Sequence, residues 1–155
     1  HKVQPDLGAL IAWNLDNGEK RIQFVNGMAA NDPVSTLQIW KFVIDRYPGE
    51  GGTCVFFNSR DDRPIRTRQM IELTLKEIKP DHFIIRGDKL QSTLNRLAYH
   101  SPITKIQTIG LKDNVGSTVD MLVGLPHDTL IYAIGNQVGA GQEILTQISK
   151  YRHYG

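Results

Sequence analysis

The chain alternates short apolar runs with longer amphipathic segments along most of its length, and few folds accept that pattern. Apolar runs of about five residues predict strands at residues 53–57, 82–86, 105–109 and 130–134. Helical spacing of apolar residues predicts helices at residues 33–47, 64–79, 90–99, 116–125 and 142–151. Strands that alternate with helices form parallel βαβ units with right-handed crossovers. The pattern therefore predicts one α/β domain of Rossmann-like type, with three layers and a mostly parallel sheet.

The first elements depart from this alternation. Residues 7–13 and 20–25 are β-prone, and the connecting segment 15–19 contains Asn17-Gly18. Asn-Gly is the strongest short signal for a two-residue hairpin turn. The sheet is therefore predicted to begin with an antiparallel hairpin.

Composition describes an ordinary soluble domain. The chain has 155 residues, 40% of them apolar, and a net charge of +2, which is too small to indicate nucleic acid binding. The single cysteine, Cys54, lies in an apolar run and is predicted to be a buried, reduced thiol, which suits a reducing compartment. No stretch approaches the roughly 20 apolar residues of a membrane span, so membrane association would need a partner. The histidines have no metal-ligand spacing, so no metal site is predicted.

The segment of residues 58–69 follows an apolar strand, opens a helix and carries four arginines and two aspartates. Guanidinium forks bind carboxylates and phosphates bidentately, and ligand crevices in open α/β sheets lie at the carboxyl ends of strands. Arginines at a helix N-terminus also oppose the helix dipole, which stability alone does not favour. The segment predicts the floor of an anion-binding site, and a solvated helix start with local ion pairs is the alternative.

Two further loops are predicted to converge at the same edge of the sheet. Residues 26–33 carry Asn26, Asn31 and Asp32 beside a helix start, which also fits a turn with an N-cap. Residues 135–143 are rich in glycine, which lets a backbone approach a phosphate. Their spacing matches neither the dinucleotide fingerprint nor a Walker A loop, so the signal is weak by itself.

A smaller candidate is the turn at residues 86–89, which contains Arg86 and Asp88 at a strand end and fits a tight turn equally well. No Gly-x-x-x-x-Gly-Lys-Ser/Thr segment occurs in the sequence. The chain alone is therefore expected to hydrolyse no ATP.

Taken in order, residues 25–36, 58–67 and 134–141 resemble the C-terminal region of the poly-γ-glutamate synthases, the Mur-ligase-like capsule ligases of bacteria. The resemblance covers essentially the whole chain, and three ordered motifs at similar intervals are more specific than any one of them. The first loop is also similar to the Asp-Gly-Ala-His-Asn-Pro-type segment of Mur ligases and folylpolyglutamate synthases, with Asn31 and Pro33 at the matching Asn and Pro. An alanine stands where those relatives have histidine, so a nucleotide contact through that side chain is lost here.

The resemblance implies that residues 1–155 are a single C-terminal lid and substrate domain of an ATP-dependent acid–amino-acid ligase. A central domain with the phosphate loop and the Mg²⁺ ligands would lie outside this chain, so ATP and Mg²⁺ would bind mainly there and the isolated domain would be inactive. ATP would phosphorylate the terminal carboxylate of a poly-γ-glutamate chain, and the amine of an incoming glutamate would attack the acyl phosphate. Integral-membrane partner subunits would hold the enzyme at the inner, cytoplasmic face of the cell membrane, and a homo-oligomer would also fit.

The resemblance and the charge pattern together assign roles to individual residues. Arg60 and Arg63 are expected to bind a carboxylate or phosphate during catalysis, with Asp62 orienting Arg63. Contacts on the nucleotide side are expected from Asn26, Asn31 and Asp32. Substrate contacts are expected from a larger set, whose glycines allow close backbone approach: Arg66, Arg86, Asp88, Gly135, Asn136, Gly139 and Gly141.

Two other functions stay open at this level. A free-standing nucleotide-binding Rossmann-like module fits the fold, but the dinucleotide fingerprint and the acid for a ribose 2′-hydroxyl are missing. Firm nucleotide binding by the isolated chain would favour it over the ligase domain. A non-catalytic interaction or oligomerisation domain would need no ligand, and changes at Arg60 and Arg63 would then alter assembly and leave polymer synthesis intact.

Overall fold

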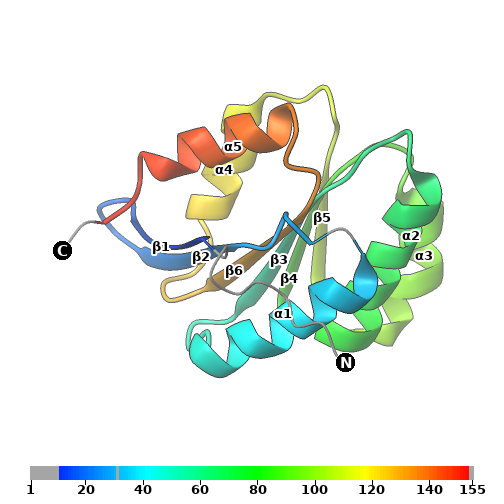
Figure 1. Cartoon of the computed structure of the whole chain (residues 1–155), viewed down its shortest axis with the longest axis horizontal. Coiled ribbons are helices and arrows are strands. Elements are labelled where there is room, and N and C mark those ends of the chain that lie inside the picture. The colour runs from blue at the N-terminus through cyan, green and yellow to red at the C-terminus, as the bar shows by residue number, and fades with distance from the viewer. Residues whose placement is uncertain (1–10, 31, 154–155) are drawn as a thin grey trace, which may run out of the picture.

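The computed structural model describes residues 11–30 and 32–153, which form a six-stranded sheet with helices on both faces (Figure 1). The strand order is β1-β2-β6-β3-β4-β5; β1 and β2 are antiparallel and all other neighbours are parallel. The predicted fold class, a mostly parallel α/β sheet that opens with an antiparallel hairpin, is confirmed. In chain order, the elements are β1 (Ile11–Asp16), β2 (Arg21–Asn26), α1 (Pro33–Arg46), β3 (Thr53–Asn58), α2 (Pro64–Leu73), η2 (Thr74–Ile78), β4 (His82–Arg86), α3 (Gln91–Leu97), η3 (Ala98–His100), β5 (Lys105–Ile109), α4 (Val115–Val123), β6 (Leu130–Gly135) and α5 (Ala140–Ser149).

Two apolar layers hold the helices against the sheet. Successive side chains of a strand point to opposite faces, so the buried run of β3 supplies both layers. Val55 and Phe57 pack in the layer with α1, α2 and α3, while Cys54 and Phe56 pack in the layer with α4 and α5. Complete burial raises the pKa of the Cys54 thiol well above its usual range, which makes it an unreactive core residue.

The connections place α2 and α5 on opposite faces at the middle of the sheet. β3 and β6 are neighbours, and Asn58 is paired with Gly135 at their carboxyl ends. The chain leaves β3 toward α2 on one face and leaves β6 toward α5 on the other (Figure 1). Loops that diverge in this way leave a crevice at the ends of the strands, where open α/β sheets bind ligands. The topology therefore puts the candidate site above β3 and β6.

The N-terminal hairpin turns at the predicted residues, but its first strand extends further. The Asn17 N–H donates to the Lys20 carbonyl oxygen at 3.2 Å, and Gly18 has a φ of +94°. β1 continues to Asp16, beyond the expected end at residue 13, because Leu15 is buried in the layer with α4 and α5. The expected start at residues 7–10 lies outside the described residues.

Several helices end differently from the expectation. α2 is α-helical only to Leu73, and the rest of the expected helix is the π-helix η2, which ends where Lys79 adopts a φ of +51°. The buried Thr74 hydroxyl donates to the Met70 carbonyl oxygen at 2.8 Å, at the point where the helix widens. α3 likewise passes into the 3₁₀ turn η3, and the remaining helix ends shift by one or two residues.

Tyr132, in β6, joins the start of α1 to the centre of the sheet. Its hydroxyl donates to the Thr36 carbonyl oxygen at 2.9 Å, and its ring centroid lies 5.5 Å from that of Trp40. Burial raises the pKa of Tyr132 well above its usual range, so the hydroxyl stays protonated and keeps donating. This contact fixes the helix that follows the first candidate loop.

We expect Tyr132→Phe to lower the free energy of unfolding by about 1 kcal/mol, because it removes one buried neutral hydrogen bond and keeps the ring. Urea unfolding of both proteins measures the difference. Tyr47→Phe, at the half-buried end of α1, is the matched control and should change stability by less than about 0.5 kcal/mol. An equal effect of the two substitutions would contradict the anchoring role of Tyr132.

Candidate functional site

A cavity of about 600 Å³ lies above the ends of β3 and β6, and the structure brings the three candidate loops together around it. Residues from α2 close its side. We call it the arginine cavity, because three guanidiniums and no carboxylate line it. Its lining residues are Met28, Ala29, Ala30, Phe57, Asn58, Ser59, Arg60, Arg63, Arg66, Thr67, Met70, Gly135, Asn136, Gln137 and Val138.

Two asparagines clamp the loops after β3 and β6 to each other. The Asn58 Nδ2 donates to the Asn136 carbonyl oxygen at 2.7 Å, and the Asn136 N–H donates to the Asn58 carbonyl oxygen at 2.7 Å. Asn58 is only 2% exposed, so these bonds are shielded from water. The Asn136 side chain folds over its own loop, where its Oδ1 accepts from the Val138 N–H at 3.2 Å. The Asn136 side chain therefore stabilises its own loop, and that loop forms part of the cavity wall.

Two of the predicted glycines allow the protein's own backbone, rather than a ligand, to approach closely. A side chain at Gly135 would collide with the Asn58 carbonyl oxygen, and one at Gly141 would collide with the Asn136 carbonyl oxygen. These glycines therefore permit the asparagine clamp. Gly139 has open space around it and a φ of +70°, so it is needed for the turn into α5. A direct ligand contact of any of the three stays a prediction.

The arginine loop differs from the expectation in one pairing. Asp62 orients Arg60 and not Arg63: the Arg60 Nε donates to the Asp62 Oδ1 at 2.9 Å, and its NH2 donates to the Oδ2 at 2.8 Å. Arg60 and Asp62 are separated by one residue, so the turn brings their side chains together. Arg63 is the N-cap of α2 and forms no such pair with Asp62. The hydrogen bonds from Arg60 hold the pKa of Asp62 below its usual range, so the aspartate is ionised at neutral pH.

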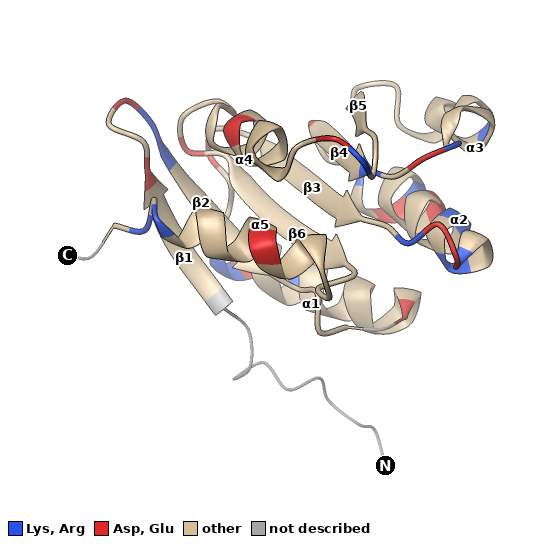
Figure 2. Ribbon diagram, turned by 90° about the horizontal axis from the view of Figure 1, so that it is seen from above, with Lys and Arg blue, Asp and Glu red and all other residues tan. Residues whose placement is uncertain are grey.

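Arg63 and Arg66 are the guanidiniums of the cavity that no carboxylate neutralises within ion-pair distance in the part of the chain that the structure describes. Both are exposed, and Arg63 is the N-cap of α2 without any side-chain cap bond. The helix dipole opposes both charges, and an anion near the uncapped N–H groups would offset that repulsion. In the ribbon of Figure 2, blue basic and red acidic segments lie next to each other between the end of β3 and the start of α2. Arg68, one turn further, does not line the cavity.

Arg86 and Asp88 do not reach the cavity, because the protein uses both side chains itself. Arg86 is 2% exposed and donates to the Thr118 hydroxyl at 2.9 Å and to the carbonyl oxygens of Leu111 and Asp113 at 3.0 and 2.7 Å. The Asp88 Oδ1 accepts from the Leu111 N–H at 3.1 Å. Both residues therefore hold the loop between β5 and α4.

Two buried polar atoms near this point have no hydrogen-bond partner among the described residues: the Arg86 Nε and the Asn58 Oδ1. Their residues are register partners on β4 and β3. Burying such atoms without a partner is unfavourable, because each one loses its hydrogen bonds to water.

The expected nucleotide residues also have internal partners. The Asn26 Oδ1 accepts from the Met28 N–H at 2.9 Å, and its Nδ2 lies 3.5 Å from the Gln137 Oε1. Asp32 caps α1 by accepting from the Ser35 N–H at 2.8 Å and from the Ser35 hydroxyl at 2.9 Å. These bonds, with a contribution from the charge of Arg66, lower the pKa of Asp32. Asn31 lies outside the described residues.

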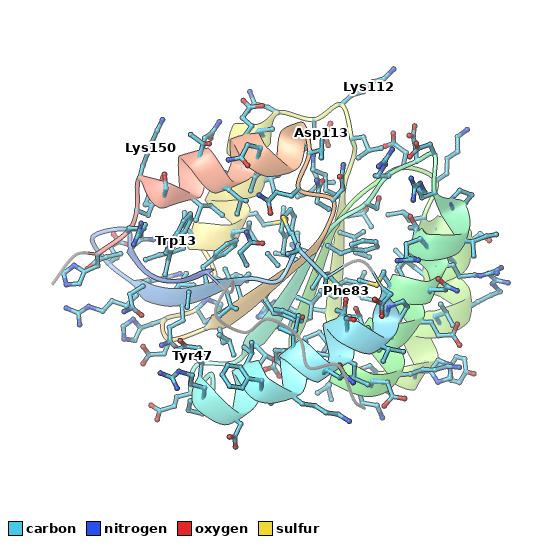
Figure 3. The ribbon with its side chains drawn as sticks, in the orientation of Figure 1. Trp13, Tyr47, Phe83, Lys112, Asp113 and Lys150 are labelled. Atoms are coloured by element: carbon cyan, nitrogen blue, oxygen red, sulfur yellow. The ribbon has the colours of Figure 1, made fainter. Side chains whose placement is uncertain are left out.

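A second cavity, of about 380 Å³, adjoins the first across Asn58, and sequence reasoning missed it. We call it the acidic cavity, since both aspartates of the loop, Asp61 and Asp62, line it. Leu111 contributes the third wall, from the β5–α4 loop whose tip carries Lys112 and Asp113 (Figure 3). The sequence signal that could have revealed this cavity is that the β5–α4 loop follows a parallel strand, as the other candidate loops do. Its full lining is Asn58, Ser59, Arg60, Asp61, Asp62, Leu111, Asn136, Val138 and Ala140.

In the described ranges, no three His, Cys, Asp or Glu side chains converge as metal ligands. The helices in those ranges also include none with the length and apolar character to cross a bilayer. Guanidiniums beside an uncapped helix start have the charge to attract anions.

Comparisons with known proteins agree on one family. Residues 13–151 match the family model described as "Poly-gamma-glutamate synthase CapB C-terminal domain". The chain is 32% identical over 152 residues to PGA synthase CapB of Bacillus subtilis and 30% identical over 148 residues to the capsule biosynthesis protein CapB of Bacillus anthracis. These alignments cover 96% and 94% of this chain but only 38% and 32% of the relatives. The chain thus spans about a third of the length of those proteins.

Two solved structures share the fold at low sequence identity. A domain from a putative UDP-N-acetylmuramate:L-alanyl-gamma-D-glutamyl-meso-diaminopimelate ligase of Haemophilus ducreyi has a TM-score of 0.52 and 16% identity, over 82% of this chain and 91% of that domain. MurF of Acinetobacter baumannii has a TM-score of 0.52 and 10% identity, over 83% of this chain and 28% of that protein. At these identities the likeness establishes the fold alone.

The cap at Asp32 predicts a specific pH dependence of stability. Its folded-state pKa lies below the ordinary value of 3.8, so its contribution is present above pH 4 and is lost as the pH falls through the folded pKa. We expect Asp32→Ala to lower the free energy of unfolding by about 1 kcal/mol at pH 7 and by progressively less as the pH falls through the folded-state pKa of Asp32. Denaturant unfolding across this range measures the effect. Asp32→Asn, which keeps an accepting oxygen, is the control; a pH-independent loss in the alanine variant would contradict the assignment.

Proposed function

The chain belongs to the family of poly-gamma-glutamate synthase CapB C-terminal domains, and on that premise we propose that it is the substrate-binding lid of an ATP-dependent ligase that joins glutamate into poly-γ-glutamate. In the proposed reaction, the terminal carboxylate of the growing chain takes the γ-phosphoryl group of ATP. The amine of an incoming glutamate then attacks the acyl carbon, releases phosphate and loses a proton as the amide forms. Every species that the lid would contact before amide formation carries negative charge.

The observation that carries this proposal is the arginine cavity. Arg63 and Arg66 offer guanidiniums without a carboxylate partner among the described residues, beside the uncapped start of α2. Preorganised donors of this kind stabilise charge that develops in a transition state, because they need no reorganisation during the reaction. We assign Arg63 and Arg66 to carboxylate or phosphate groups of the substrates, and Arg60 to a third anionic group. Asn26, Asn31 and Asp32 form the loop that would approach the nucleotide side.

The lid role rests on the missing phosphate-binding segment and on exposed apolar side chains near the candidate loops. No Walker A segment occurs in this sequence, and ATP and Mg²⁺ are proposed to bind mainly to the part of the protein that corresponds to the remaining length of its relatives. Val34, Ile65 and Val138 are 67%, 65% and 77% exposed at the starts of α1 and α2 and before α5. Val138 lines the arginine cavity, whereas Val34 and Ile65 lie outside its lining. Burial of these exposed apolar side chains against that other part would help to exclude water from an acyl phosphate.

The proposal also extends to partners. A polymerase of capsule glutamate needs an outlet for its product, and we propose integral-membrane partner subunits that hold the enzyme at the inner face of the membrane. A homo-oligomer remains compatible with this arrangement.

We expect Arg63→Ala in the full-length ligase to reduce polymer synthesis about 100-fold, because loss of one charge-assisted contact in a closed site removes about 2–4 kcal/mol of transition-state stabilisation. Arg63→Lys should restore little, since an ammonium cannot copy a two-bond fork. Arg68→Ala, on the same helix but outside the cavity, is the control and should retain activity. The measurement is polymer formation by each variant at saturating ATP, with thermal melting as the folding control. Normal synthesis by Arg63→Ala would show that Arg63 does not belong to the site.

We also expect the purified 155-residue chain to be folded but catalytically silent, because its apolar layers are complete while a triphosphate-binding loop is missing. The measurement is glutamate-dependent ATP turnover, with circular dichroism as the folding control. Turnover by the chain itself, free of any full-length enzyme, would contradict the lid assignment.

A further inference from the structure

We infer that the Arg60–Asp62 ion pair opens to bind the two charged groups on the α-carbon of the incoming amino acid, with Arg60 taking the α-carboxylate and Asp62 taking the α-ammonium. The inference rests on the proposed function, since it concerns the same site. It goes further by assigning an amine-binding group and a ligand orientation.

The first observation is where the pair lies. Arg60 lines both cavities, Asp62 lines only the acidic cavity, and the other guanidiniums line only the arginine cavity. The ion pair therefore lies at the boundary between the arginine cavity and the acidic cavity. A zwitterion placed at that boundary would find its negative end directed toward one compartment and its positive end toward the other.

The second observation is the geometry of the pair. Asp62 meets the Arg60 fork with two hydrogen bonds, of 2.9 and 2.8 Å, which is the arrangement that a ligand carboxylate adopts on an arginine. The Asp62 carboxylate thus occupies the place on Arg60 that a substrate carboxylate would take. A ligand that brings only an anion would have to displace Asp62 and leave its charge without a partner.

The third observation is exposure. The side chains of Arg60 and Asp62 are 43% and 59% exposed, and the two residues flank a single position in a loop. Water solvates both groups of such a pair, so the pair contributes little to stability and exchanges partners readily. An α-amino acid replaces the internal pair by two intermolecular ones and leaves no charge unmatched. The side-chain carboxylate of glutamate would then reach Arg63 and Arg66 in the arginine cavity.

This orientation predicts that Asp62 distinguishes glutamate from glutarate, which has the two carboxylates but no amine. The experiment measures the KM for glutamate and the inhibition constant of glutarate in the full-length ligase, for wild type and Asp62→Asn. We expect the KM for glutamate divided by the inhibition constant of glutarate to rise about tenfold or more in Asp62→Asn. The reason is that a charge-assisted contact to the ammonium of glutamate is lost. Glutarate should bind as well or better, because Arg60 is released from its internal partner.

Asp45→Asn, on α1, is the matched control, because it removes the same charge from an exposed aspartate that lines neither cavity. It should keep the wild-type ratio. Arg60→Gln should weaken both ligands by similar factors, since both present a carboxylate to it. An unchanged ratio in Asp62→Asn, or an equal shift in Asp45→Asn, would overturn the inference.

The outcomes also separate this inference from the proposed function. If the wild-type ligase neither uses glutamate nor is inhibited by glutarate, the proposed function fails. If wild type shows both effects and Arg63→Ala weakens both ligands, while Asp62→Asn leaves their ratio intact, the proposed function stands and only the assignment of the ammonium to Asp62 fails.

Discussion

The site depends on the asparagine clamp between β3 and β6. At this point the chain sends α2 and α5 to opposite faces of the sheet, so the two loops would separate without a connection. The paired hydrogen bonds of Asn58 and Asn136, both 2.7 Å, provide that connection. Gly135 and Gly141 make room for it, because a side chain at either position would strike a carbonyl oxygen of the clamp. The arginine loop thus starts from a strand end that the clamp holds in place.

Four arginines near the carboxyl edge of the sheet are used in three different ways. Arg86 is buried and held by carbonyl oxygens, so it organises the β5–α4 loop. Arg60 is bound by Asp62, and Arg63 and Arg66 face the cavity without such a partner in the described part of the chain. Placing two like charges at a helix start opposes the dipole and lowers stability slightly. A bound anion would offset this repulsion between the two arginines and the helix dipole.

Sequence reasoning identified the elements well where periodicity was strong and identified contacts poorly where a neighbour in space decided them. Apolar runs located β3, β4 and β6 almost to the residue, since burial on both faces requires them to be continuous, while the edge strand β5 is mostly exposed. The π-helix η2 has no sequence signal of that kind. Asp62 was expected to orient Arg63 and instead binds Arg60, because the partner depends on the path of the turn. The acidic cavity was missed because its third wall comes from a loop that carries no recognisable motif.

The sequence by itself determined the layers, the mostly parallel sheet and the presence of an arginine loop at the end of a central strand, because these follow from hydrophobic periodicity and the local rules for helix starts. Only the tertiary structure decided which arginines face the cavity and which serve the fold. The reason is that charge and hydrogen-bonding capacity are local properties of a residue, whereas their availability depends on what packs around it. Arg86 and Arg63 are the same residue type at the ends of neighbouring strand–loop units, and burial alone separates a structural tie from a ligand-binding candidate.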